Sequence, residues 1–148
     1  IDFERLRIYL KEKYQIDTAY YYIGYIMPEN QDLYTKLQKA GFILIFKQQT
    51  EKLLSQKKGN IDSDLIFSAM QHLLDYSEQF EKILLISGDG DFKILVDYLI
   101  KKERFLKILL PNKKFASSLY KKLSWKYVDH LINIQRKIEY QKRRSRKH

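Results

Sequence analysis

The chain has 148 residues, of which 45% are hydrophobic, so it has the size of one domain with a buried core. It contains no cysteine, which excludes disulfides and zinc–thiolate sites and agrees with a cytoplasmic protein. No apolar run approaches the roughly 20 residues that cross a bilayer, and no signal pattern opens the chain, so we expect no membrane partner.

The formal net charge is +10, which predicts affinity for a polyanion, because lysine and arginine displace counterions from phosphates. The last thirteen residues carry +6 of this charge and include Arg143 and Arg144. A solvated end that aids solubility and an arm that binds nucleic acid explain such a tail equally well. We expect one domain at residues 1–139 and a disordered basic tail at residues 140–148.

Helical and extended patterns alternate along the chain. Apolar residues at steps of three and four predict helices at residues 3–14, 30–40, 61–76, 92–99 and 114–123. Apolar runs rich in aromatic and β-branched residues predict strands at residues 18–26, 42–46, 82–87 and 105–110. Residues 48–59 are polar and predict a long loop, and a short segment around Tyr127 precedes a last helix. The alternation predicts an α/β fold with three layers, α/β/α, around a mainly parallel central sheet.

An acidic turn follows the third apolar strand. In open α/β sheets ligands bind beyond the carboxyl ends of the strands, which is where Asp89 and Asp91 stand. Gly88 and Gly90 permit a tight turn, and residues two apart in extended chain point to the same side. The two carboxylates can therefore converge on one ion. The alternative is an ordinary turn in which Asp91 caps the next helix.

A second acidic group opens the helix that precedes this strand. Carboxylates in a first helical turn usually interact with the helix dipole and its free N–H groups, and we expect this of Asp64, with a partly exposed side chain. Asp62 differs, because its helix leads directly into the third strand and its first turn can lie near the same sheet edge. Three converging carboxylates without Cys or His favour Mg²⁺ or Mn²⁺.

The run ILLISGDGDF, residues 83–92, resembles the signature strand and turn of NYN domains, a LabA-like branch of the PIN-like nucleases. The upstream run KGNID, residues 58–62, is similar to the Lys-Gly-x-x-Asp element of that family. The order of predicted elements also agrees over residues 1–131. The resemblance implies a PIN-like fold and metal-dependent endonucleolytic cleavage of RNA.

Carried over by motif, the resemblance implies metal binding by Asp62, Asp89 and Asp91 as catalytic carboxylates. It implies that Ser87 orients the turn or a metal-bound water. Two departures stand out. Relatives usually begin with a central strand ending in Asp, and we expect this first strand to be absent here, because the given sequence begins at the entrance to the helix that follows it. Ser68 stands where many relatives carry a further Asp.

We therefore predict a metal-dependent endoribonuclease, with Mg²⁺ or Mn²⁺ as cofactor and RNA as partner. Lys113 and Lys114, with Arg143 and Arg144 of the tail, are expected to bind the RNA phosphates. The alternative function is a non-catalytic RNA-binding module that keeps the fold but lacks a complete acidic site. The oligomeric state is open, and a homodimer is one option.

Overall fold

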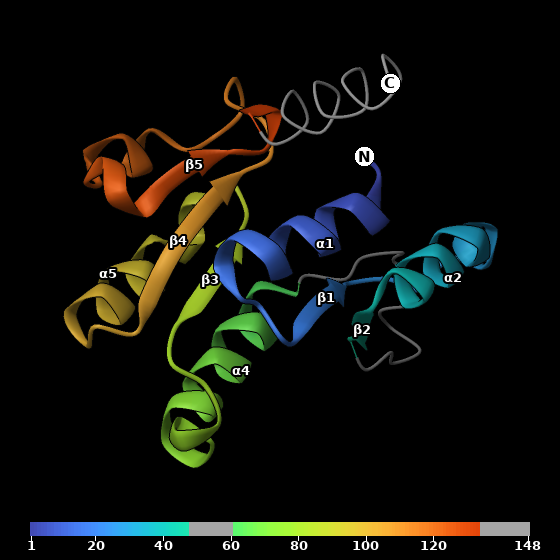
Figure 1. Ribbon diagram of the computed structural model, residues 1–148, viewed down its shortest axis with the longest axis horizontal. Helices are drawn as coiled ribbons and strands as arrows, with labels where there is room; N and C mark the ends of the chain where they lie inside the picture. The colour runs from blue at the N-terminus through green and yellow to red at the C-terminus, as the bar shows by residue number, and fades with distance from the viewer. Residues whose placement is uncertain (48–60, 134–148) are drawn as a thin grey trace, which may run out of the picture. The chain divides into compact units, whose positions relative to one another are not determined.

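The computed structural model describes residues 1–47 and 61–133 and divides into two compact units, Ile1–Leu65 and Ile66–His148 (Figure 1). Each unit combines helices with parallel strands, so the predicted α/β class is confirmed. The strands form two sheets, with the orders β1-β2 and β3-β4-β5. None of the helices in the described ranges is long and apolar enough to span a membrane.

Within residues 1–47, the first unit holds two strands and two complete helices. Its elements in chain order are α1 (Phe3–Tyr14), β1 (Ala19–Ile23), the 3-10 turn η1 (Pro28–Asn30), α2 (Gln31–Ala40) and β2 (Phe42–Phe46). β1 and β2 pair in parallel with Ala19 opposite Phe42. Their arrows are neighbours in Figure 1. Gly41 ends α2 with a φ of 103°, a left-handed conformation that glycine adopts without strain.

An aromatic cluster holds α1 against this two-stranded sheet. The rings of Phe3, Tyr21 and Phe42 meet edge to face, with centroids 5.9 to 6.3 Å apart. Arg7 of α1 adds two hydrogen bonds, from its guanidinium to the carbonyl oxygens of Ile16 and Asp17, at 2.9 and 2.7 Å. The charged face and the apolar face of α1 therefore both fix the chain that enters β1.

The second unit is built on a three-stranded parallel sheet. The helix α4 (Asp62–Asp75) begins in the first unit and leads into it. The other elements are η2 (Ser77–Gln79), β3 (Ile83–Ile86), η3 (Gly90–Phe92), α5 (Lys93–Lys101), β4 (Phe105–Leu110), η4 (Ser118–Lys122), η5 (Trp125–Tyr127) and β5 (Val128–His130). β4 is the central strand and the most buried, and α5 lies beside it (Figure 1). Leu95, Val96 and Leu99 of α5 are buried.

One prediction for the second unit is wrong. The helix expected at residues 114–123 is absent, and the chain there forms a turn and the short 3-10 helix η4. Ser117 is extended and its hydroxyl oxygen accepts the N–H of Leu119 at 3.2 Å, a local bond that competes with helix formation. The short segment around Tyr127 and Val128, to which the sequence assigns no structure, contains a strand, β5, which pairs in parallel with β4.

Other predicted elements agree closely with the structure. The helix at residues 3–14 and the strands at residues 42–46 and 105–110 have the predicted bounds. The strand expected at residues 18–26 is shorter, because it ends at Ile23 before Gly24. The loop predicted at residues 48–59 and the boundary predicted near residue 140 lie outside the described residues.

Candidate functional site

The turn after β3 is shaped by hydrogen bonds within the motif SGDGDF. The Ser87 hydroxyl oxygen accepts the backbone N–H of Asp89 at 3.1 Å. The Asp89 carboxylate in turn accepts the backbone N–H of Asp91 at 2.9 Å and so caps η3. The alternative in which Asp91 is the cap is wrong, because the residue that precedes α5 is Phe92 and makes no side-chain cap. Ser87 thus fixes the backbone that carries both acidic side chains.

Asp89 and Asp91 form a close pair at the carboxyl end of β3. Both are exposed, and a carboxylate oxygen of one lies within 4.8 Å of a carboxylate oxygen of the other. Two negative charges at this separation repel by about 1 kcal/mol in bulk water and by about 3 to 4 kcal/mol at an effective dielectric constant of 20. A bound divalent cation removes this cost, and carboxylate oxygens are the ligands that hard cations prefer.

The segment after β4 is bonded to this acidic turn. The backbone N–H of Ser117 donates to the carbonyl oxygen of Gly88 at 2.9 Å. A Cβ atom on Gly90 would lie 2.6 Å from the Ser117 hydroxyl oxygen and 3.1 Å from the Ser117 Cβ, so the Ser117 side chain would have to shift. The close approach of Ser117 therefore favours glycine at position 90.

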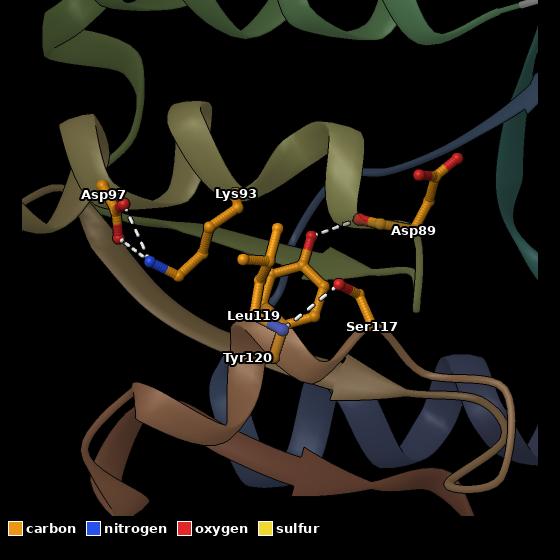
Figure 2. A network of polar contacts seen from close by, with 6 residues as sticks. All are labelled: Asp89, Lys93, Asp97, Ser117, Leu119 and Tyr120. Atoms are coloured by element: carbon orange, nitrogen blue, oxygen red, sulfur yellow. Dashed lines mark hydrogen bonds and ion pairs between the residues drawn. The ribbon is translucent and has the colours of Figure 1, made fainter.

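Tyr120 makes the second bond between the two segments. Its side chain is 2% exposed, and its hydroxyl donates to the carbonyl oxygen of Asp89 (Figure 2). Figure 2 shows the Asp89 carboxylate pointing away from this bond, so the backbone is held while the carboxylate stays accessible. Burial, together with the charges of Asp89, Asp91 and Asp97, raises the pKa of Tyr120 to about 12. The hydroxyl therefore keeps its proton and remains a donor at neutral pH.

Asp62 is the first residue of α4, as the sequence predicts, and its side chain is half-buried. α4 begins in the first unit and continues unbroken into the second. Asp64, two residues on, pairs with Lys47 at an N–O distance of 3.3 Å, and its side chain is 44% exposed. The partial exposure predicted for Asp64 is confirmed, and a lysine of the first unit neutralises it.

A cleft of about 480 Å³ adjoins the acidic turn within the second unit. Three residues of the turn, Gly88, Asp89 and Gly90, line one part of it. Residues from the segment after β4 line the rest, namely Pro111, Asn112, Phe115 and Ser117. Lys113 and Lys114 are exposed on this segment, between two lining residues in the chain. The predicted phosphate-binding residues Arg143 and Arg144 lie outside the described ranges.

The sequence did not predict Asn112 as part of this site, nor three further residues: Ser117, Tyr120 and Phe115. All three lie in the segment predicted as a helix, in which they would have been assigned to helix faces. The available signal was the run Pro111-Asn112, which ends β4 at the same sheet edge as the acidic turn. Parallel pairing of β3 with β4 brings the chain after each strand to one edge, so both segments belong to one candidate site.

The second unit has a parallel sheet with a polar turn and a cleft at the carboxyl ends of its strands. These features place the protein in the class of α/β proteins whose candidate site lies where the strands end. The chain matches the family model of the NYN domain over residues 1–131 and belongs to the NYN domain family. The resemblance in the sequence is thereby confirmed, and with it the PIN-like fold and a nuclease-type, RNA-related function. Comparison with curated proteins gave no match, and comparison with solved structures gave none either.

Proposed function

We propose that the protein is a metal-dependent endoribonuclease, whose divalent cation, Mg²⁺ or Mn²⁺, is held by Asp89, Asp91 and Asp62. The observation that carries the proposal is the Asp89–Asp91 pair, two exposed carboxylates held close together on a bonded turn at the strand end. Family membership supports the reaction, because nucleases of the PIN-like kind use divalent metals.

The donor chemistry of these residues fits such a cation. One oxygen of Asp89 accepts the N–H of Asp91, and the second oxygen has no hydrogen bond within the described parts of the chain. Asp91 contributes a second carboxylate, and the proposal adds Asp62 as a third ligand, because carboxylate oxygens are the donors that hard cations prefer. When bound, the cation supplies an activated water and neutralises charge on the phosphate oxygens.

The surrounding residues have supporting roles in this proposal. Ser87 positions the backbone N–H of Asp89, and Tyr120 holds the Asp89 carbonyl oxygen, so the turn is fixed from both sides. Lys113 and Lys114 bind the phosphates of the RNA on either side of the cleaved bond. A rigid carboxylate pair and neighbouring cations are the preorganised electrostatics that phosphodiester cleavage requires.

The test is cleavage of an end-labelled RNA by the full chain with Mn²⁺ or Mg²⁺, compared with the same reaction in EDTA. We expect Asp89→Asn, Asp91→Asn and Asp62→Asn each to lower the cleavage rate by roughly 100-fold or more, since loss of a ligand exceeds the 10- to 100-fold cost of losing an outer-shell partner. Asp64→Asn is the matched control for Asp62, because Asp64 lies in the same helical turn and pairs with Lys47.

Equal cleavage by the wild type and the three Asn variants would overturn the assignment of these residues. Tight RNA binding without any metal-dependent cleavage would contradict the enzyme and support the alternative, a non-catalytic RNA-binding module. A loss of cleavage in Asp64→Asn as large as in Asp62→Asn would remove Asp62 from the metal site and leave only the Asp89–Asp91 pair.

A further inference from the structure

The cleft beside the acidic turn has an aromatic wall that the proposed cleavage chemistry does not use. Phe115 lines it and is 77% exposed, although an aromatic side chain of this size gains free energy from burial. Pro111 lines the same cleft and adds apolar surface. Exposed apolar side chains gathered in a cleft, rather than scattered singly, are typical of a binding site.

Polar groups surround this apolar surface. The Asn112 side-chain oxygen accepts the N–H of Lys114 at 2.9 Å, which fixes the orientation of the amide. The amide nitrogen of Asn112 is then left as a donor, and it has no hydrogen bond among the residues described. The ammonium group of Lys114 lies 5.7 Å from the centroid of the Phe115 ring, so a positive charge adjoins the aromatic face.

The cleft therefore combines an aromatic face and an amide donor beside a turn proposed to hold a cation, and two exposed lysines lie on the same segment, between lining residues in the chain. A nucleotide presents the complementary set, namely a planar base, polar base edges and a phosphate. The cleft is open to solvent, and its volume of about 480 Å³ gives room for one base.

We propose that this cleft binds one unpaired base of single-stranded RNA, stacked on Phe115, next to the phosphate presented to Asp89 and Asp91. This inference rests on the proposed function, since it names the form of RNA that the same site accepts. Phe115 is the stacking residue, Asn112 donates to a base edge, and Lys113 and Lys114 bind the adjacent phosphate. A paired base cannot stack here, because its neighbours in the duplex cover both of its faces.

A direct test uses the single tryptophan of the chain, Trp125. Trp125 is 86% exposed and does not line the cleft, so in the wild type it reports on surface outside the site. The double variant Phe115→Trp/Trp125→Phe moves the only tryptophan into the cleft. We expect an oligouridine, added in EDTA to prevent cleavage, to quench the fluorescence of this variant strongly and that of the wild type weakly.

A binding measurement gives the energetic counterpart. We expect Phe115→Ala to weaken binding of the oligouridine by about 5- to 150-fold, which corresponds to the loss of one base–aromatic stacking contact. Phe115→Trp restores binding because tryptophan also stacks. Trp125→Ala is the matched control, since it removes an aromatic side chain that is at least as exposed, and it leaves binding unchanged. Binding of a blunt RNA duplex is unchanged in all of these variants.

The inference is overturned if Phe115→Ala binds the oligouridine as the wild type does, if Trp125→Ala causes an equal loss, or if the wild type does not bind it. Equal weakening for single-stranded and duplex RNA also overturns it. Failure of the proposed function gives a different set of results from failure of this inference. If Phe115→Ala weakens binding but no metal-dependent cleavage occurs, the stacking site stands and the nuclease does not. If Asp89→Asn abolishes cleavage while Phe115→Ala cleaves and binds normally, the nuclease stands without this site.

Discussion

Two segments follow neighbouring strands to the same sheet edge, residues 87–92 after β3 and residues 111–122 after β4, and their sequences specify them differently. The first is defined locally, because Ser87 and Asp89 bond to backbone groups two residues on. The second is defined by what it contacts, because Ser117 and Tyr120 bond to the first segment across about thirty residues of chain. The acidic turn can therefore be predicted from the sequence, whereas the role of the segment that supports it can be recognised only in the folded structure.

The largest effect on this pair of segments is expected from Gly90→Ala. The added methyl group would meet the Ser117 hydroxyl oxygen at 2.6 Å, so one segment must move away from the other. We expect a loss of about 1 to 3 kcal/mol in the free energy of unfolding, the usual cost of overpacking, measured by urea denaturation. Affinity for Mn²⁺ should fall as well, because the same movement displaces the carboxylates.

Gly41→Ala is the control for this prediction. Gly41 has a φ of 103°, so alanine there costs about 1 to 3 kcal/mol of backbone strain in the first unit. We expect lower stability with unchanged Mn²⁺ affinity in the folded protein. In Gly90→Ala/Ser117→Ala the closest contact is removed, and part of the lost stability should return. No recovery in the double variant would contradict the close approach as the cause.

A smaller effect is expected from Tyr120→Phe, which removes only the hydroxyl bonded to the Asp89 carbonyl oxygen. At neutral pH we expect a loss of about 1 kcal/mol, the net contribution of one hydrogen bond. The pH dependence is more specific. The pKa of Tyr120 is about 12 in the folded chain against the ordinary value of 10.0, so its contribution is complete below pH 10.

Above pH 10 the unfolded chain ionises first, and this stability is lost as the pH rises toward 12. Two pKa units correspond to about 2.7 kcal/mol, so the wild type should lose up to about that amount relative to Tyr120→Phe. Urea denaturation of both proteins from pH 8 to pH 11.5 measures the difference, in which the other tyrosines cancel. Parallel curves for the two proteins would contradict the burial of a protonated Tyr120.

The smallest effect is expected from Asp97→Asn. Asp97 pairs with Lys93 one helical turn away, at 2.6 Å, but its side chain is 54% exposed (Figure 2). Exposed pairs of this spacing contribute about 0.3 to 0.5 kcal/mol, so stability should change by no more than that. Because the charge of Asp97 is one cause of the raised pKa of Tyr120, the alkaline loss should move slightly toward lower pH. A shift toward higher pH would exclude that cause.

The predictions from the sequence succeeded for elements that are defined locally and failed for elements that depend on contacts with distant residues. The bounds of α1, β2 and β4 were predictable because each is set by its own periodicity or by an uninterrupted apolar run. β5 was not, because it has only three residues, two of them polar or charged, and depends on pairing with β4. The 3-10 helix η4 was also not predictable. The spacing of its apolar residues resembles that of an α-helix, whereas Ser117 and Tyr120 use their polar groups to bond to the acidic turn.

The candidate site divides in the same way. Asp89, Asp91 and Ser87 could be named from one short motif, and Asp62 from the start of the preceding helix. Phe115 and Asn112 could not, because nothing local marks an aromatic side chain as exposed or an amide as oriented. Their roles depend on the parallel pairing of β3 with β4, which fixes where both following segments lie.

The central claim is that the turn after β3 is a metal site, and direct titration of the full chain with Mn²⁺ tests it most closely. Calorimetry should show one Mn²⁺ bound per chain in the wild type, and the same in Asp64→Asn and Asp97→Asn. Binding should be lost in Asp89→Asn and in Asp91→Asn. Unchanged Mn²⁺ affinity in both of these variants would contradict the account.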